Sequence, residues 1–438
     1  MRIAIVGCLH GSLSEMYQTL PPVDLVLCCG DFQGFRNEAD LDSCHVPEKY
    51  RTLGSFHHYY AEPRDIPLTI VVGGNHEASN YMCELFYGGW LAHNIYYLGV
   101  AGSVIVNGLR IAGASGIYNQ NSFGRGHFER APLKGGSLRS VYHLRQWNEE
   151  RLRLLPPVDI FLSHDWPVDI TKYGDGKALV SAMPRFRSSI DTGTFGAPPL
   201  TRVLNAIRAR YWFAAHMHVK FPAVKVHAAN PTVSEPHYPS DPTPKEWLDA
   251  HAIHPRGSIK PGPTNQRATR FLALSKPLPG KKDWWQEVLD IPAPSDKSPP
   301  TLTFDRAWLA ITKATHPFPR AHNPPILPDG ASALPPSTLP ADVNARIEAA
   351  LSSLDNSAEV SNVQVFVKTA PAEGDGIPEA HYTNPQTTAF CAFLGIQDLT
   401  NPAPRTAARP NDSNIGRGRG GSNGNRGARG GSRGARGG

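Results

Sequence analysis

Five short clusters of metal-binding residue types lie in the first half of the chain. In chain order, they are Cys8-x-His10, Gly30-Asp31, Asn75-His76, His164 and His216-x-His218. Imidazole, carboxylate, amide oxygen and thiolate together suit one or two divalent transition ions. Two ions about 3.5–4 Å apart can hold a hydroxide between them and stabilise both the attacking and the leaving oxygen of a phosphate displacement. These residue types therefore predict hydrolysis of a phosphate ester.

Each cluster follows a short run rich in apolar and β-branched residues, and these runs cover residues 2–7, 23–29, 68–72, 158–162 and 211–215. Helical segments, for example at 81–87 and 141–155, lie between several of the runs, and strands that alternate with helices predict an α/β fold. In such folds the carboxyl ends of several strands converge on one site. A single histidine is usually a core or surface residue, but ligand-type residues at five strand ends are hard to obtain by chance.

Composition narrows the class of protein. The chain has 438 residues, of which 40% are hydrophobic, so it can bury a substantial core. Its six cysteines show no regular spacing, which favours a reduced, intracellular protein over a disulfide framework. Residues 1–7 are typical of a strand rather than a signal peptide, and no apolar run approaches the roughly 20 residues of a membrane span. We therefore expect no membrane association.

The basic character of the chain belongs to its end. Residues 405–438 hold eight Arg and one Asp, a net charge of +7, so the rest carries −1 of the total of +6. Loss of periodicity and richness in proline mark a boundary near residue 230. We expect four parts: a catalytic domain at 1–230, a flexible insertion or linker at 231–269, a smaller C-terminal domain at 270–400, and a disordered Arg/Gly tail at 401–438.

The order of the five clusters resembles that of the calcineurin-like metallophosphoesterases, although Cys8 stands where most of that superfamily has Asp. This resemblance implies a metallophosphoesterase-type β-sandwich flanked by helices. A finer resemblance is to the lariat debranching enzymes, which characteristically have Cys at that position. It is carried by sequence words such as GDFQ at 30–33, GGNHEASNY at 73–81, LSHDWP at 162–167 and WFAAHMHVKF at 212–221. The match is dense over residues 1–230 and thin over 270–397.

The resemblance implies an RNA lariat debranching activity, in which activated hydroxide attacks the 2′,5′-phosphodiester bond at the branch point of an excised intron. The expected setting is intron turnover after splicing in the nucleus, and we expect a monomer. One metal pocket resembles that of the family at Cys8, His10, Asp31 and His218. The second pocket shares Asp31 and adds Asn75, His164 and His216. We expect Asp31 and Asn75 to be catalytic as well as ligands.

His76 resembles the family's non-ligand histidine, which faces the scissile phosphate and stabilises or protonates the leaving 2′-oxygen. A positioned acid of this kind typically contributes about 10²–10⁴-fold to the rate. A purely structural histidine is the alternative. Because thiolate is softer than carboxylate, Cys8 favours Zn²⁺ or Fe²⁺ over Mg²⁺, and Mn²⁺ is a third candidate. A buried Cys8 thiol beside a single metal ion remains the other interpretation.

Residues 117–144 resemble the family's lariat recognition loop and combine cations with aromatic rings, which bind phosphates and stack on unpaired bases. The expected RNA contacts are Tyr118, Asn119, Arg125, His127, Phe128, Arg139, Tyr142 and His143. An ordinary solvated loop is the alternative. The Arg/Gly tail could bind other RNA through its charge, or it could simply be a flexible solubilising segment.

Two other functions are compatible with parts of this pattern. A phosphoprotein phosphatase or nucleotide phosphodiesterase would share the superfamily pattern, but it would not be expected to carry Cys8 or the long segment at 117–144. A non-catalytic RNA-binding protein could retain the scaffold, but decayed enzymes usually lose ligands, and every ligand position is filled here. The debranching function is therefore preferred.

Overall fold

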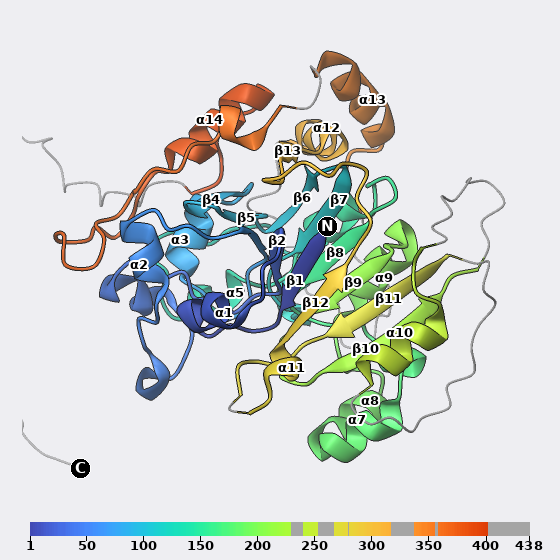
Figure 1. The fold of residues 1–438 in the computed structure, drawn as a ribbon. Coiled ribbons are helices and arrows are strands. Elements are labelled where there is room, and N and C mark those ends of the chain that lie inside the picture. Colours follow the sequence, from blue (N-terminus) through green and yellow to red (C-terminus); the bar gives the residue numbers. More distant parts are fainter. Residues whose placement is uncertain (229–239, 253–266, 279, 317–336, 355–357, 402–438) are drawn as a thin grey trace, which may run out of the picture. The chain divides into compact units, whose positions relative to one another are not determined.

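Two β-sheets packed face to face form the centre of the fold (Figure 1). The computed structural model describes residues 1–228, 240–252, 267–278, 280–316, 337–354 and 358–401. Apart from Asn401, the predicted tail lies outside these residues, as does most of the predicted linker. The predicted α/β sandwich flanked by helices is confirmed. Among the described residues, no helix is long and apolar enough to span a bilayer.

The first sheet has six strands. Their order across the sheet is β12 (Gln286–Asp290), β1 (Arg2–Val6), β2 (Leu25–Cys28), β3 (Leu68–Val71), β5 (Ile95–Tyr97) and β4 (Gly89–Ala92). Strands β1, β2, β3 and β5 are parallel, with Ile3 opposite Leu25 and Leu25 opposite Leu68. Their carboxyl ends therefore lie at one edge of the sheet.

The second sheet has seven strands. Their order is β10 (Phe221–Val226), β11 (Ala268–Ala273), β9 (Tyr211–Ala214), β8 (Ile160–Ser163), β7 (Leu109–Ala114), β6 (Ala101–Val106) and β13 (Leu302–Phe304). The four central strands, β11, β9, β8 and β7, are parallel. The tight turn between β6 and β7 contains Asn107 and Gly108, both with positive φ, as expected for an Asn-Gly hairpin.

Helices cover the outer faces of the sandwich. The helices are α1 (Leu13–Thr19), α2 (Phe56–Ala61), α3 (Ser79–Glu84), α4 (Gln120–Phe123), α5 (Gly136–Ser140), α6 (Gln146–Leu152), α7 (Gly176–Ala182), α8 (Arg187–Asp191), α9 (Pro198–Ile207), α10 (Pro244–His251), α11 (Lys282–Trp285), α12 (Arg306–Ala314), α13 (Val343–Ser353) and α14 (Pro385–Leu394). Short 3-10 helices are η1 (Glu38–Ser43), η2 (Glu48–Tyr50), η3 (Ile170–Tyr173), η4 (Pro184–Phe186) and η5 (Val360–Asn362). The helices α1, α2 and α3 pack on the first sheet, and α6, α9 and α12 pack on the second.

Alternation of side chains along the strands fills both layers of core. In β1, Ile5 faces the second sheet and packs in the same cluster as Ile111 and Leu162. Its neighbour Ala4 faces the helices and packs in the same cluster as Met16. Successive side chains of a strand point to opposite faces, so one strand of buried residues can serve two layers.

The C-terminal region completes both sheets. The strand β12 pairs antiparallel with β1, β11 lies between β10 and β9, and β13 pairs with β6. Residues 1–404 accordingly form one compact unit. The strands predicted to belong to a separate C-terminal domain are therefore integral to the catalytic sheets.

Part of the predicted flexible linker is the helix α10, so the expectation of a flexible segment is wrong for residues Pro244–His251. Thr243 and Glu246 form a capping box at its start, with Pro244 in the first turn. Trp247 is buried, and its indole N–H donates to the Phe271 carbonyl at 3.1 Å. The helix is thereby fixed against β11.

Candidate metal centre

The five predicted clusters meet at the carboxyl ends of β1, β2, β3, β8 and β9. Four of their residues turn the chain with left-handed backbone: φ is 47° at His10, 47° at Asp31, 63° at His216 and 55° at His218. This conformation costs a non-glycine residue roughly 1–3 kcal/mol and is concentrated at functional sites. The left-handed turns direct side chains from separate strands toward the same site.

One donor group contains Cys8, His10, Asp31 and His218. Each offers a ligand atom, and these atoms all lie within 4.8 Å of one another. The Nε2 atoms of His10 and His218 are 3.1 Å apart, and Nε2 of His10 lies 3.7 Å from Oδ2 of Asp31. Zinc-type ions bind nitrogen at about 2.0–2.1 Å and sulfur at about 2.3 Å, so donors gathered this closely fit one such ion.

A second donor group lies on the other side of Asp31. Oδ1 of Asp31 lies 3.4 Å from Nε2 of His164. The same His164 nitrogen lies 3.2 Å from the side-chain amide oxygen of Asn75. The His216 ring packs beside the His164 ring, with 4.9 Å between centroids. On its far side, Nδ1 of His164 donates to the Cys29 carbonyl at 2.8 Å, which directs Nε2 toward the site. Asp31 can therefore bridge two ions.

Two glycines make room for this arrangement. A Cβ atom on Gly74 would lie 2.2 Å from Oδ1 of Asp31, and one on Gly30 would lie 2.5 Å from Nδ1 of His164. Gly30 also has a φ of 101°, which side-chain-bearing residues rarely adopt. The loops after β2 and β3 thus need glycine for close approach.

Glu77 joins these two loops, a role that the sequence motif did not reveal. Its carboxylate accepts hydrogen bonds from the backbone N–H groups of Phe32 at 2.9 Å, Gln33 at 2.8 Å and Gly74 at 2.8 Å. Burial, with a further contribution from Asp31, raises the pKa of Glu77 to about 7. Glu77 therefore holds the backbone around Asp31 and Asn75.

Burial sets the protonation states of the first donor group. It lowers the pKa of His10 to about 4 and that of His218 to about 3, so both imidazoles are neutral near pH 7 and can donate to a cation. Burial raises the pKa of Asp31, because it disfavours the charged carboxylate. The opposite effect of His164 and His10 is larger, so the pKa of Asp31 lies well below its usual value. Burial and Asp31 raise the pKa of the Cys8 thiol, although the His216 N–H donates to its Sγ atom at 3.2 Å and acts in the opposite direction. A bound cation would favour the thiolate further.

The segment after β11 also contributes, although residues 270–400 were expected to form a separate domain. The Ser275 carbonyl accepts from the Cys8 N–H at 3.2 Å, and the Ser275 hydroxyl donates to the His218 carbonyl at 2.9 Å. The nearby charge of Lys276 lowers the pKa values of His10 and His218, after the larger effect of burial and other neighbours. This segment supports the first donor group from the C-terminal side.

His76 lies beside the donor groups. Its backbone N–H donates to Oδ1 of Asp31 at 2.9 Å, and its ring centroid is 5.9 Å from that of His10. Its Nδ1 atom lies 3.1 Å from the His45 carbonyl oxygen. This position suits a residue that faces the reacting phosphate instead of binding a metal.

The predicted recognition loop is an ordered structure containing α4 and α5. Arg145 is buried at its base and donates to the Glu129 carboxylate at 2.5 Å and to the Ser122 carbonyl at 2.8 Å. Glu129 also accepts from the Ser140 hydroxyl at 2.5 Å. A buried Arg–carboxylate pair with these further hydrogen bonds closes the loop on itself.

Three of the eight predicted RNA contacts lie on the accessible side of this loop. Phe128 is 42% exposed, Arg139 is exposed and Arg125 is partly exposed. The Arg145 guanidinium lies 5.5 Å from the Phe128 ring centroid. These three side chains are therefore available to phosphates and bases.

The other five predicted contacts have partners within the protein. Asn119 caps α4, and Tyr118 packs against Phe123. His127 bonds with Asn148 at 3.0 Å, His143 bonds with Ser122 at 2.9 Å, and the Tyr142 hydroxyl lies 3.3 Å from Nδ1 of His45. Their first role is to shape the loop.

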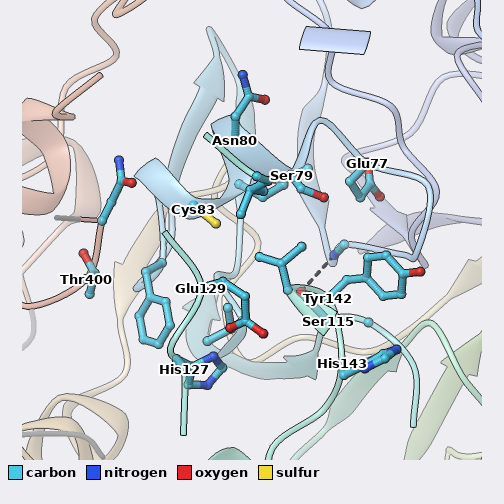
Figure 2. Close-up of a pocket in the computed structure, with 18 of the residues that line it drawn as sticks. Glu77, Ser79, Asn80, Cys83, Ser115, His127, Glu129, Tyr142, His143 and Thr400 are labelled. Carbon is cyan, nitrogen blue, oxygen red and sulfur yellow. Dashed lines mark hydrogen bonds between the residues drawn. The ribbon is translucent and has the colours of Figure 1, made fainter. Parts of the chain in front are cut away.

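A cavity lies next to the loop that follows β3, and Figure 2 shows residues that line it. The empty space here is about 910 Å³, part of which is open solvent, and its walls come from the loop after β3, from α3 and from the recognition loop. Phe86 and Leu133 give it apolar surface, while Cys83 and Glu129 add polar groups. Gly74 lines the cavity and also abuts Asp31, so a group in the cavity would sit next to the site.

A donor set of this kind, at the carboxyl ends of strands in a two-sheet sandwich, defines a metal-dependent phosphodiesterase of the calcineurin-like class. The family model for calcineurin-like phosphoesterases matches residues 1–220. The model for the C-terminal domain of lariat debranching enzymes matches residues 266–399.

Curated relatives narrow the class to one family. A lariat debranching enzyme of Arabidopsis thaliana is 38% identical over 434 residues, covering 93% of this chain and 90% of the relative. The lariat debranching enzyme of Homo sapiens is 39% identical over 419 residues, covering 91% and 70%. The one of Drosophila pseudoobscura pseudoobscura is 40% identical over 425 residues, covering 91% and 77%. This chain belongs to the lariat debranching enzyme family, as its sequence words predicted.

Proposed function

We propose that this protein hydrolyses the 2′,5′-phosphodiester bond at the branch point of intron lariats. The products are a linear RNA with a freed 5′-phosphate and a branch nucleotide with its 2′-hydroxyl restored. The observation that carries the proposal is Asp31, whose two carboxylate oxygens face two separate donor groups. An ordered, cation-bearing loop and a cavity beside this residue support a branched RNA as the substrate.

The donors fit divalent ions, and we propose Fe²⁺, Zn²⁺ or Mn²⁺. One ion would be held by the first donor group, and a second by Asp31, Asn75, His164 and His216. When bound, such ions polarise a phosphate and lower the pKa of water. Neutral imidazoles and a buried cysteine favour these metals over Mg²⁺.

His76 holds the proton that the leaving 2′-oxygen needs. Its backbone is fixed by the hydrogen bond to Asp31, and its ring lies beside the donor groups. Arg125 and Arg139 bind flanking phosphates, and Phe128 offers a ring on which an unpaired base stacks. The cavity beside the site receives a base, because its walls combine apolar surface with hydrogen-bonding groups.

The expected biological setting follows from this substrate. Lariats are products of splicing, which places the enzyme in the nucleus. Every proposed ligand comes from one chain, which supports a monomer as the active form. The Arg/Gly tail adds loose contacts to other RNA through its charge.

The test is turnover of a defined branched RNA by metal-free protein supplied separately with Fe²⁺, Zn²⁺ or Mn²⁺. A linear RNA of the same sequence, joined only by 3′,5′ linkages, is the matched substrate. We expect cleavage of the 2′,5′ bond and little cleavage of the linear RNA. Equal cleavage of both would indicate a general phosphodiesterase, and no cleavage with any of the three metals would overturn the proposal.

A further inference from the structure

Two hydrogen bonds connect the recognition loop to His76. The Tyr142 hydroxyl lies 3.3 Å from Nδ1 of His45, and the His45 carbonyl oxygen lies 3.1 Å from Nδ1 of His76. Tyr142 follows α5, His45 lies between η1 and η2, and His76 follows β3. Three segments that are distant in the sequence are thus connected in series, and the last of them carries His76.

We infer that His45 and Tyr142 are positioning residues for His76, a role that rests on the proposed function. When Nδ1–H of His76 donates to the His45 carbonyl, Nε2 is the ring nitrogen left to face the leaving group. As the P–O2′ bond breaks, its electron pair stays on O2′, and the proton moves from Nε2 of His76 to O2′. His76 begins this step as imidazolium, keeps its Nδ1–H and ends as neutral imidazole.

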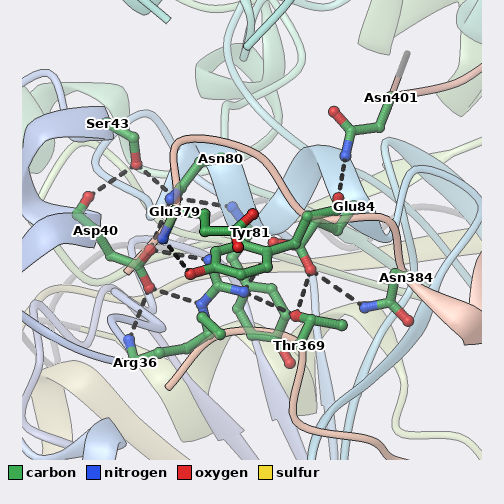
Figure 3. A network of polar contacts seen from close by, with 12 residues as sticks. Arg36, Asp40, Ser43, Asn80, Tyr81, Glu84, Thr369, Glu379, Asn384 and Asn401 are labelled. Carbon is green, nitrogen blue, oxygen red and sulfur yellow. Dashed lines mark hydrogen bonds and ion pairs between the residues drawn. The ribbon is translucent and has the colours of Figure 1, made fainter. Parts of the chain in front are cut away.

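The backbone before His45 is firmly held, as Figure 3 shows. Arg36 is buried and donates to both Asp40 oxygens at 2.9 Å. The Ser43 hydroxyl donates to the Asn80 side-chain oxygen at 2.7 Å, and the Asn80 amide donates to Asp40 at 2.6 Å. Since Asn80 belongs to α3, which follows His76 in the chain, these hydrogen bonds connect η1 to the segment that carries His76.

The C-terminal region strengthens the same support. Arg36 donates to the Thr369 hydroxyl at 2.9 Å and to Glu84 at 2.7 Å, and Thr369 donates to Glu84 at 2.6 Å. Segment 36–43 is therefore fixed from two sides.

Beyond Ser43, the side chain of His45 has one hydrogen-bond partner among the described residues, which is Tyr142. Tyr142 is half-buried, lines the cavity and is labelled there in Figure 2. A base that enters the cavity contacts Tyr142. This contact restrains His45, whose carbonyl in turn fixes the orientation of the His76 ring. Recognition of the branched RNA is in this way coupled to protonation of its leaving group.

The test compares two leaving groups. Branched RNA needs a proton on O2′, whereas bis(4-nitrophenyl) phosphate releases a stable phenolate that needs none. The variants are Tyr142→Phe, which removes only the hydroxyl, and His45→Ala, which keeps the carbonyl but removes its tether. The control is Tyr50→Phe, because Tyr50 is 61% exposed and its hydroxyl has no hydrogen-bond partner among the described residues.

We expect Tyr142→Phe and His45→Ala each to lower kcat on branched RNA about 10-fold, with KM within about twofold of the parent. Activity on the nitrophenyl ester should stay within about twofold in both. The double variant should be no worse than either single variant, because both changes remove one shared tether. Tyr50→Phe should match the parent on both substrates.

A second measurement does not depend on turnover. In protein loaded with diamagnetic Zn²⁺ and labelled with ¹⁵N-histidine, the Nδ1 proton of His76 should give a protected signal in the parent and in Tyr50→Phe. That signal should broaden or vanish in Tyr142→Phe.

Three results would overturn the inference: an unchanged kcat on RNA, a rise in KM alone, or equal losses on both substrates. Failure of the proposed function is a different result, since the parent itself would then cleave the nitrophenyl ester and leave branched RNA intact.

Discussion

Oδ1 of Asp31 lies 3.4 Å from Nε2 of His164, while Oδ2 of Asp31 faces His10 at 3.7 Å. One carboxylate therefore serves both donor groups. No other described Asp or Glu belongs to the first donor group, so no second carboxylate replaces it there.

Asp31→Ala should bring turnover of branched RNA below detection, because it removes the bridging anion from both groups. Metal content, measured by mass spectrometry after dialysis against Mn²⁺ or Zn²⁺, should fall with it. Asp42→Ala is the control, since that side chain is 90% exposed. Full activity in Asp31→Ala would rule out the two-pocket arrangement.

Glu77→Gln should destabilise the fold and slow catalysis together. Three backbone N–H groups donate to the Glu77 carboxylate, and an amide offers a single acceptor oxygen in its place. Leaving buried donors unpaired costs about 1–3 kcal/mol, which denaturant titration can measure. Glu62→Gln, at an exposed position, should leave the free energy of unfolding unchanged. If Glu77→Gln were as stable and active as the parent, the loops after β2 and β3 would not depend on this carboxylate.

The donors themselves could be predicted from the sequence because their positions depend on local patterns. A short apolar run ends, a ligand-type residue follows, and a parallel sheet brings such ends to one edge. Predicting Asp31, His164 and His216 as donors required only this rule and the family resemblance. The order of the clusters then fixed the class of fold.

The supporting contacts could not be predicted in the same way. Strand β12 pairs with β1 through Gln286 and Val6, and nothing in a five-residue run encodes so distant a partner. Ser275 and His45 each act partly through a backbone carbonyl, which every residue type carries. By contrast, α10 carried a readable signal, the Thr243–Glu246 capping box, which the richness in proline obscured.

Arg139→Ala should weaken RNA binding without changing the chemical step. Arg139 is exposed on the recognition loop, so its charge can neutralise one phosphate. For single strands, each such contact contributes about 0.7 to the slope of log affinity against log salt concentration. We expect KM to rise and this slope to decrease by about that amount, with kcat preserved. The exposed Arg187, on α8, gives the control Arg187→Ala, and an equal effect there would show that only net charge matters.

Deleting residues 405–438 separates the two interpretations of the tail. The chemistry belongs to residues 1–404, which form one compact unit, so turnover of a minimal branched oligonucleotide should be unchanged. The tail carries a net charge of +7, and a segment that binds RNA through charge gains affinity from long RNA and loses it in salt. If the tail binds RNA, the truncated protein should bind a long lariat more weakly at low salt, and the difference should shrink as salt is added. If the tail only solubilises the protein, affinity should be the same at every salt concentration, and the truncated protein should precipitate at lower concentration. A large loss of turnover on the minimal substrate would contradict both interpretations and place the tail in the catalytic machinery.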